Sequence, residues 1–388
     1  MRTCCTTIVF GLTTSALAAP RPQVLNYALV NGAGPAPNVT VPIGAYSTFM
    51  TYDATAVAFD TAAQVTAELL PQQKRSLDFW NTLPSRAVSS GKERSKRSDG
   101  NCDPLPSGHG PVPSPDTPSA FLSYSAFVSA ATKAPTPSGY VKSFTNLQAS
   151  NIALGFMGSV SQSTYDPNAC ATLCDSHNGC IGFNIFFERD PTKDPGAACS
   201  NPPSTTVIKC VFWGGPVTRD NAKSIGERTS AFQVVIAGSN GYYKSNTATI
   251  AGYNGLTALG NAAIQAPTDQ TYMGYYIFDD GRPFDSRRCA AACTAQSAYN
   301  IAHSTRGETS PRLCRFFNTY ILNLNGIPQS QMCVLYTQTW TSSYATNFGQ
   351  TEGSNLQQQH GSWPSESVVF VFHVNRSLHV SYFLVFEL

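Results

Sequence analysis

The stretch Asp166-Pro167-Asn168-Ala169-Cys170-Ala171-Thr172-Leu173-Cys174 decides how the first half of the chain folds, because it predicts a short helix. Asp166 is a good N-cap acceptor, Pro167 suits the first helical position, and Asn178-Gly179 ends the helix. Cysteines four residues apart lie on one helical face with Cβ atoms about 5–6 Å apart, whereas a disulfide needs about 3.5–4.5 Å. Cys170 and Cys174 therefore each need a partner outside the helix.

A second copy of this stretch lies in the C-terminal half. There Asp285 precedes an alanine-rich run that contains Cys289 and Cys293 and has high helix propensity. The same offset relates three pairs of matched motifs, which are Gly155-Phe156 with Gly274-Tyr275, Tyr165-Asp166 with Phe284-Asp285, and the two Cys-x-x-x-Cys motifs. At other offsets, Cys180-Ile181-Gly182-Phe183-Asn184 matches Cys314-Arg315-Phe316-Phe317-Asn318, and Cys210-Val211-Phe212-Trp213 matches Cys333-Val334-Leu335-Tyr336. Variable offsets are typical of loop insertions in a shared framework, so the sequence predicts a tandem duplication.

In each copy the remaining cysteines open apolar runs that predict strands. Cys180 precedes Phe183–Phe187, and Cys210 precedes Val211-Phe212-Trp213. Once the pair inside the helix is excluded, two connectivities remain for the four cysteines, and both staple the helix to a sheet. Zinc binding is the alternative, but the paired Cys-x-x-Cys spacings of structural zinc sites do not occur.

The helical Cys-x-x-x-Cys, the following Cys-x-x-Phe-Asn and the cysteine-led aromatic strand resemble the PAN/apple module of secreted proteins, in the arrangement of fungal secreted proteins with two such modules. The resemblance covers roughly residues 138–375. It implies an α+β fold with two tandem PAN/apple-like modules, each a twisted antiparallel β-sheet crossed by one short α-helix and stapled by two disulfides. The implied pairs are Cys170–Cys210, Cys174–Cys180, Cys289–Cys333 and Cys293–Cys314.

Two departures from the family pattern stand out. The third pair that joins the termini of animal apple modules has no counterpart, and the spacing between Cys293 and Cys314 is much longer than that between Cys174 and Cys180. Cys102 then remains, with Cys199 as its partner by elimination. We expect this last pair to bridge a linker to the first module.

The first residues of the chain predict secretion. Residues 1–19 combine Arg2, an apolar centre at 8–12 and a small-residue cleavage site near Ala18 or Ala19, which is the pattern of a signal peptide. Its removal takes away Cys4 and Cys5 and leaves an even number of cysteines, which suits disulfides in an oxidising compartment. No other stretch is long and apolar enough to predict a transmembrane segment, so we expect an extracellular protein, with a cell wall as one place of association.

Residues 20–97 are interpreted as a propeptide. They contain the dibasic steps Lys74-Arg75 and Lys96-Arg97, where processing proteases cut exposed chains. A solvated charge run that is never cut is the alternative. Residues 98–118 are rich in Pro, Gly, Ser and Asp and predict a semi-extended linker. Glycosylation sequons begin at Asn38 and Asn375, and only the second survives removal of the propeptide.

The remaining boundaries follow from the repeat. We place module 1 at 119–240, a linker at 241–254, module 2 at 255–375 and a tail of unassigned structure at 376–388. Copy one is expected to close with the strand Phe232–Ile236. In copy two the nearest candidate is 367–374, with a misread gene end or a lipid-anchor tail as alternatives, although the apolar run is short for an anchor.

Charge and motifs exclude several function classes. Only 12% of residues are charged, and beyond residue 97 acidic residues outnumber basic ones, so the chain lacks the basic footprint of a nucleic-acid binder. A nucleophile elbow, phosphate loop, zinc helix and dinucleotide turn are all missing, so no catalytic residue, metal or cofactor is predicted.

His373 and His379 have no metal-pair spacing. Asp279-Asp280-Gly281-Arg282 is a fragment of a calcium loop or, as we favour, a turn.

The candidate ligand-binding residues are aromatic. Trp213, Tyr336 and Trp340 lie beside the last cysteine of each module, where exposed rings could stack on sugars or anchor a protein. Packing of the helix on the sheet is the alternative. Asn184 and Asn318 occupy matching sites and are expected to satisfy a backbone group near the helix. Glu188-Arg189-Asp190 could bind a polar ligand but is favoured as a solvated loop.

These observations favour a secreted, non-catalytic recognition or adhesion protein that binds an extracellular glycan or protein through two modules, with avidity if both engage one surface. A structural component of a fungal cell wall or fruiting tissue is the runner-up. An enzyme with an unrecognised site is the third hypothesis. The sequence leaves the ligand and the oligomeric state open.

Overall fold

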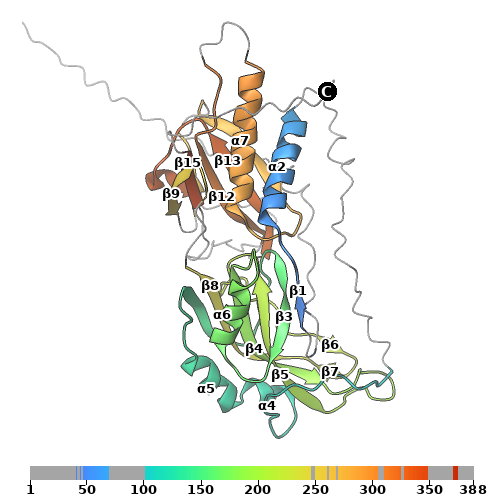
Figure 1. The fold of residues 1–388 in the computed structure, drawn as a ribbon. Coiled ribbons are helices and arrows are strands. Elements are labelled where there is room, and N and C mark those ends of the chain that lie inside the picture. The colour runs from blue at the N-terminus through green and yellow to red at the C-terminus, as the bar shows by residue number, and fades with distance from the viewer. Residues whose placement is uncertain are drawn as a thin grey trace, which may run out of the picture.

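The computed structural model describes residues 41, 44, 47–69, 101–245, 250–259, 262–267, 270–304, 310–324, 327–347 and 370–374. Two antiparallel sheets, each with a helix on one face, lie one beyond the other along the molecule (Figure 1). The fold class is therefore α+β, as expected.

The first module contains a sheet with the strand order β1-β3-β5-β4-β8-β2. The helix α6 (Pro167–Asp175) lies on one face, and α4 (Pro118–Leu122), α5 (Ser125–Lys133) and the small hairpin of β6 (Arg228–Thr229) and β7 (Phe232–Gln233) surround the sheet. The strands of the sheet are β1 Thr48–Phe49, β2 Tyr140–Leu147, β3 Phe156–Gln162, β4 Gly182–Pro191, β5 Ser204–Trp213 and β8 Ile236–Lys244.

The second module contains a sheet with the order β11-β13-β12-β15-β9 and the helix α7 (Ser286–Ala302). The strand β10 (Ala263–Ile264) pairs with β14 (Ala345–Asn347), which follows the 3-10 turn Ser342–Tyr344. A further helix, α2 (Ala54–Leu69), comes from the N-terminal segment. The strands of the sheet are β9 Tyr253–Ala258, β11 Tyr272–Phe278, β12 Phe316–Leu324, β13 Ile327–Tyr336 and β15 Phe370–Val374.

The two sheets share one topology, in accord with the predicted duplication. The order β3-β5-β4-β8-β2 in module 1 corresponds, strand by strand, to the order β11-β13-β12-β15-β9 in module 2. The register corrects one match, because Gly158 pairs with Phe212 as Gly274 pairs with Leu335. Both glycines lie at a register shift with positive φ, +116° and +111°. Gly158, rather than Gly155, is therefore the counterpart of Gly274.

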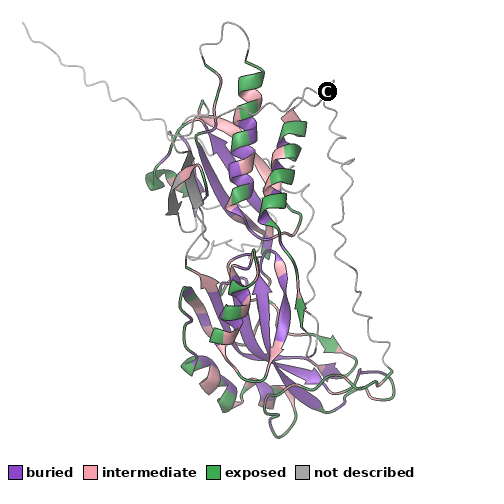
Figure 2. Cartoon of the chain, viewed as in Figure 1, coloured by how far each residue is buried: buried purple, intermediate pink, exposed green. Residues whose placement is uncertain are grey.

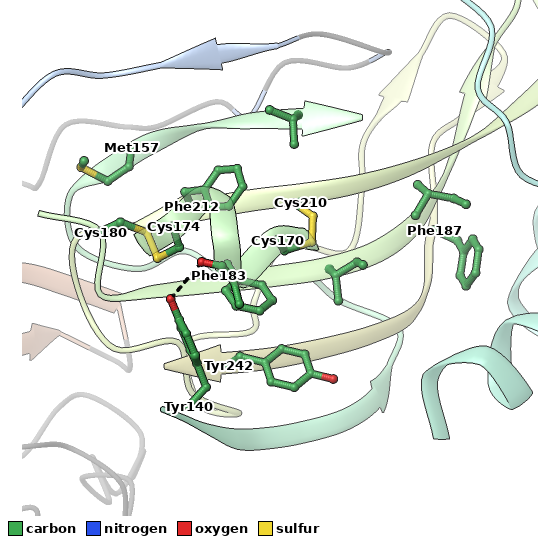
Figure 3. Packing of buried hydrophobic residues seen from close by; sticks show 14 of the residues in the cluster. Tyr140, Met157, Cys170, Cys174, Cys180, Phe183, Phe187, Cys210, Phe212 and Tyr242 are labelled. Carbon is green, nitrogen blue, oxygen red and sulfur yellow. Dashed lines mark hydrogen bonds between the residues drawn. A yellow bond between two sulfur atoms is a disulfide. The ribbon is translucent and has the colours of Figure 1, made fainter. Parts of the chain in front are cut away.

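Each module's helix is capped and stapled as the sequence suggested. Asp166 accepts from the backbone N–H of Asn168 at 2.9 Å, and Asp285 accepts from that of Arg287 at 2.9 Å. The five disulfides have the expected partners, and Figure 3 shows the two that link α6 to its module, Cys170–Cys210 and Cys174–Cys180. They are Cys102–Cys199, Cys170–Cys210, Cys174–Cys180, Cys289–Cys333 and Cys293–Cys314.

The core of module 1 fills the space between α6 and the sheet. Phe183, Phe212 and Tyr242 pack there around the Cys170–Cys210 disulfide (Figure 3). The hydroxyl of Tyr140 donates to Asp175 Oδ1 at the end of α6 at 2.8 Å and lies 3.4 Å from the carbonyl oxygen of Ala171 on the same helix. The central strands β4 and β5 are buried on both faces (Figure 2), so the opposite face of the sheet carries a second core.

Two expected boundaries differ from the structure. Strand β8 runs to Lys244, past the module end placed at 240, and β9 begins at Tyr253, inside the expected linker 241–254. The closing strand of copy one is β8, because Phe232–Gln233 instead forms a hairpin with β6. Strand β15 lies within the candidate 367–374 and pairs with β12 and β9.

The expected linker 98–118 is also different, because its described part from residue 101 onward packs on module 1. The Cys102–Cys199 disulfide holds its start, and the backbone N–H of Gly110 donates to Thr206 at 3.0 Å. Asp116 pairs with the buried Arg189 at 2.8 Å and accepts from the backbone of Ser204. Local composition predicted an extended chain, but these long-range partners fix it to the module.

The modules contact each other through a glycine-lined junction. The backbone N–H of Phe284 donates to the carbonyl of Gly214 at 2.7 Å, and a Cβ on Gly214 would lie 2.5 Å from the Cα of Pro283. Leu154 and Ile181 of module 1 pack into the core of module 2. The close backbone approach explains why a residue without a side chain occupies position 214.

Candidate functional site

The N-terminal segment, residues 47–69, crosses both modules. Its strand β1 pairs antiparallel with β3, the outermost strand of module 1 itself, where Thr48 faces Ser159 and Phe49 faces Gly158 (Figure 1). The backbone N–H of Met50 donates to the carbonyl of Met157 at 2.9 Å. The described part of the expected propeptide is therefore integrated into the folded body, which the propeptide interpretation did not foresee.

The sequence of β3 is suited to this neighbour. A Cβ on Gly158 would lie 2.0 Å from the carbonyl oxygen of Thr48, so a larger residue would push β1 away. The ring of Phe49 stacks on His177, which follows α6, with centroids 3.8 Å apart, and lies 5.3 Å from the ring of Phe212. β1 thus fills the surface between the edge strand and the helix of module 1.

Tyr52 joins the two modules. Its buried ring packs into the core of module 1 beside Gly179, and its hydroxyl donates to Asp285 Oδ2 of module 2 at 2.8 Å. Burial and the neighbouring Asp285 carboxylate raise the pKa of Tyr52 well above its usual value, so the hydroxyl remains a donor. Asp285 also caps α7, so this bond ties the N-terminal segment to the start of that helix.

The helix α2 packs alongside α7. Asp53 caps α2 by accepting from the backbone N–H groups of Thr55 and Ala56. The buried side chains of α2 are spaced for one helical face, and the last of them, Val65, contacts the alanines of α7 and Tyr276 of β11. Phe59 lies on the outer side and is 75% exposed.

The segment therefore occupies corresponding places in the two modules. We define the helix–edge surface of a module as the surface between its helix and its outer strand, β3 with α6 in module 1 and β11 with α7 in module 2. In module 1 this surface holds a strand, and in module 2 it holds a helix. Sequence reasoning missed this arrangement, although Asp53 and the spacing of Val57, Thr61 and Val65 carry a helix signal.

A second feature is a group of buried charges on the sheet face opposite α6. Lys209 forms an ion pair with Glu188, and both side chains are buried. Asp190 accepts at Oδ2 from the backbone N–H of Gly44 at 3.0 Å, and no described donor reaches its Oδ1. Burial and then the Glu188 carboxylate raise the pKa of Asp190 well above its usual value, while Lys209 lowers it by less. The expectation that 188–190 form a solvated loop is wrong, because these residues lie inside β4.

Module 2 has apolar residues at the matching sites. By the register of the two sheets, Leu322 replaces Glu188 and Met332 replaces Lys209, and both are buried in an apolar cluster. The shared fold therefore does not require charges at these positions.

The predicted ligand-stacking aromatics are core residues. Trp213 is 1% exposed, Tyr336 0% and Trp340 8%, so none presents a ring face to solvent. Trp213 packs edge-on against Phe156, and the hydroxyl of Tyr336 donates to the carbonyl of Ile264. The ligand-binding interpretation of these rings is wrong, and core packing explains them.

Asn184 and Asn318 do satisfy backbone groups, but not near the helix. Asn184 Oδ1 accepts from the N–H of Asn151 at 3.1 Å, and Asn318 Oδ1 accepts from that of Ile264 at 2.9 Å. Each acceptor fixes the connection between the first two strands of its module. Because neighbouring residues such as Phe183 face α6, Asn184 points to the opposite face.

The Asp279–Arg282 stretch forms a turn. Asp280 accepts from the backbone of Arg282 and binds the guanidinium of Arg288 through two bonds of 3.0 and 2.8 Å. The same guanidinium lies 3.9 Å from the ring centroid of Phe278. The described residues contain no group of three or more His, Cys, Asp or Glu side chains that could hold a metal ion.

Several predicted residues lie outside the described part of the chain. These are the signal peptide, Asn38, Asn375, His379 and the dibasic residues Lys74, Arg75, Lys96 and Arg97. His373 is in β15. Among the described helices, none combines the length and apolarity needed to cross a membrane.

Comparison of the chain with protein-family models, curated proteins and solved structures gave no match. The resemblance to PAN/apple modules therefore stays a prediction based on the cysteine motifs.

Proposed function

We propose that this protein is a secreted, non-catalytic recognition or adhesion protein that binds an extracellular partner through its two modules. One observation carries the proposal: the helix–edge surface of each module holds a stretch of polypeptide, the same N-terminal segment in both cases. Five disulfides are typical of proteins in an oxidising, extracellular compartment.

The geometry supports a polypeptide partner better than a glycan. The rings that could have stacked on sugars are buried. In contrast, β3 accepts a strand through main-chain hydrogen bonds, which is how β-strand addition recognises peptides, and α7 accepts a helix along one face. Two surfaces on one chain would raise the avidity for a partner that spans both.

The test uses the secreted chain, intact and cut at the dibasic steps, against purified extracellular proteins, an array of synthetic peptides and soluble wall polysaccharides. We expect saturable binding to polypeptides that a synthetic peptide of residues 47–69 competes away. Saturable binding to polysaccharides alone would replace the polypeptide assignment. Concentration-dependent self-assembly without ligand binding would instead support a structural role, and turnover of a ligand would contradict a non-catalytic function.

A further inference from the structure

We infer that residues 47–69 are a tethered occupant of the two helix–edge surfaces, and that a cut between residues 70 and 97 makes this occupant replaceable. The inference rests on the proposed function only for the identity of the replacing partner. The occupancy itself is carried by the contacts of β1, Tyr52 and α2.

Residues 47–69 are joined covalently to the modules only through the main chain. Residues 20–97 contain no cysteine, and the ten cysteines from Cys102 onward pair with one another. A cut at Lys74-Arg75 or Lys96-Arg97 would therefore leave residues 47–69 attached by non-covalent contacts alone. The connection to the rest of the chain, from residue 70 to 100, carries both of these dibasic steps.

Within residues 47–69 the contacts are limited in extent, and upstream of them the backbone N–H of Gly44 adds one hydrogen bond to Asp190. β1 has two residues, and four of the 16 residues of α2 are buried. Phe59 gives most of its surface to solvent. While the chain is uncut, the covalent connection raises the effective concentration of the segment at the two surfaces, which keeps such a ligand bound. After a cut, the fraction of helix–edge surfaces that hold residues 47–69 depends only on the concentration of the released segment and on its affinity.

The position of the segment explains why its displacement would matter. It covers the edge of β3 and one side of α7 at once, so it blocks the helix–edge surface of both modules. Tyr52 reaches from the core of module 1 to Asp285, so the two blocked surfaces are held by one continuous ligand. A partner that replaces it therefore gains access to both modules together.

The experiment uses the full chain with a site-specific protease sequence in place of residues 92–97, so that cutting does not depend on natural processing. A fluorescent peptide of residues 47–69 is added to the intact and the cut protein, and bound peptide is separated by gel filtration. We expect the cut protein to bind it at least about tenfold more tightly, with release of its own unlabelled segment.

Matched variants test the contacts. Val65→Asp in the full chain should weaken the binding of the chain's own residues 47–69 to the helix–edge surfaces. The intact protein should then take up the labelled wild-type peptide. Phe59→Asp, on the exposed side of the same helix, should not change uptake.

Gly158→Ala should reduce binding by the cut protein, whereas Gly274→Ala should not, because the Cβ on Gly274 meets nothing within 4 Å. Both glycines have similar positive φ, so their backbone strain is matched.

Two outcomes overturn the inference. If the intact and the cut protein bind the peptide equally, the segment does not occupy the surfaces. If the cut protein keeps its segment and takes up no peptide during a day of exchange, the segment is a permanent part of the fold. Neither result decides the proposed function, which the ligand panel tests separately.

Discussion

The two modules have the same framework and differ in what they place on it. Both have a capped helix stapled by two disulfides, an asparagine that holds the first connection, and the same strand order. Module 1 carries a buried ion pair where module 2 carries Leu322 and Met332. The comparison separates the framework, which recurs, from additions that the framework does not need.

The largest expected effect comes from breaking the additional ion pair. Lys209→Met leaves the Glu188 carboxylate buried and unpaired, so we expect a loss of about 3–5 kcal/mol in the free energy of unfolding. The double variant Glu188→Leu with Lys209→Met copies module 2 and should be neutral or stabilising. Guanidinium unfolding with intact disulfides measures both. An equally unstable double variant would show that the charges are part of the framework.

An intermediate effect is expected from the shared asparagines. Asn184→Ala leaves the N–H of Asn151 without its acceptor, and Asn318→Ala does the same to Ile264. Each variant should lose about 1–3 kcal/mol of unfolding free energy. The exposed Asn168 provides the control, since Asn168→Ala should change stability by less than about 0.5 kcal/mol. A loss in only one module would show that the two asparagines are not equivalent.

The smallest effect is a pH dependence that only module 1 should show. The raised pKa of Asp190 means that the native state keeps a proton that the unfolded state, with an ordinary pKa of 3.8, has lost. The contribution of Asp190 to stability is therefore full below about pH 4 and declines as pH rises toward the native pKa. Glu188, Lys209 and the N–H of Gly44 surround the group.

Asp190→Asn removes this titration and keeps a polar group of the same shape. The wild type should lose stability relative to Asp190→Asn as pH rises above about 4, as measured by unfolding midpoints in the same buffers. Parallel stability curves for the two proteins would contradict the raised pKa. Leu322→Ala, in the matching apolar region of module 2, should lower stability without changing its pH dependence.

The elements that could be predicted were those whose signals are local. Asp166 and Asp285 cap their helices because capping needs a side chain within three residues. The cysteine spacing excluded a pair inside the helix. The roles of Asn184 and Asn318 were only half predicted, because their partners belong to a distant connection that the local pattern does not identify.

The candidate site could not be predicted, because its contacts join remote parts of the chain. Tyr52 and Asp285 are 233 positions apart, and Gly44 and Asp190 are 146 positions apart. The dibasic steps nearby suggested that the whole region was removable. The ligand-binding prediction was wrong for Trp213, Tyr336 and Trp340 because burial is also decided by remote contacts. An aromatic residue beside a cysteine has the same local sequence whether its ring is exposed or buried.

By itself, the sequence determined the two repeated units, their helices and the restriction on disulfide pairing, because these depend on spacing and backbone geometry over a few residues. Only the tertiary structure decided which surfaces the N-terminal segment covers, which aromatic rings are buried and where Glu188 meets Lys209. Those outcomes depend on the excluded volume and desolvation of groups brought together from distant positions, and no local pattern records them.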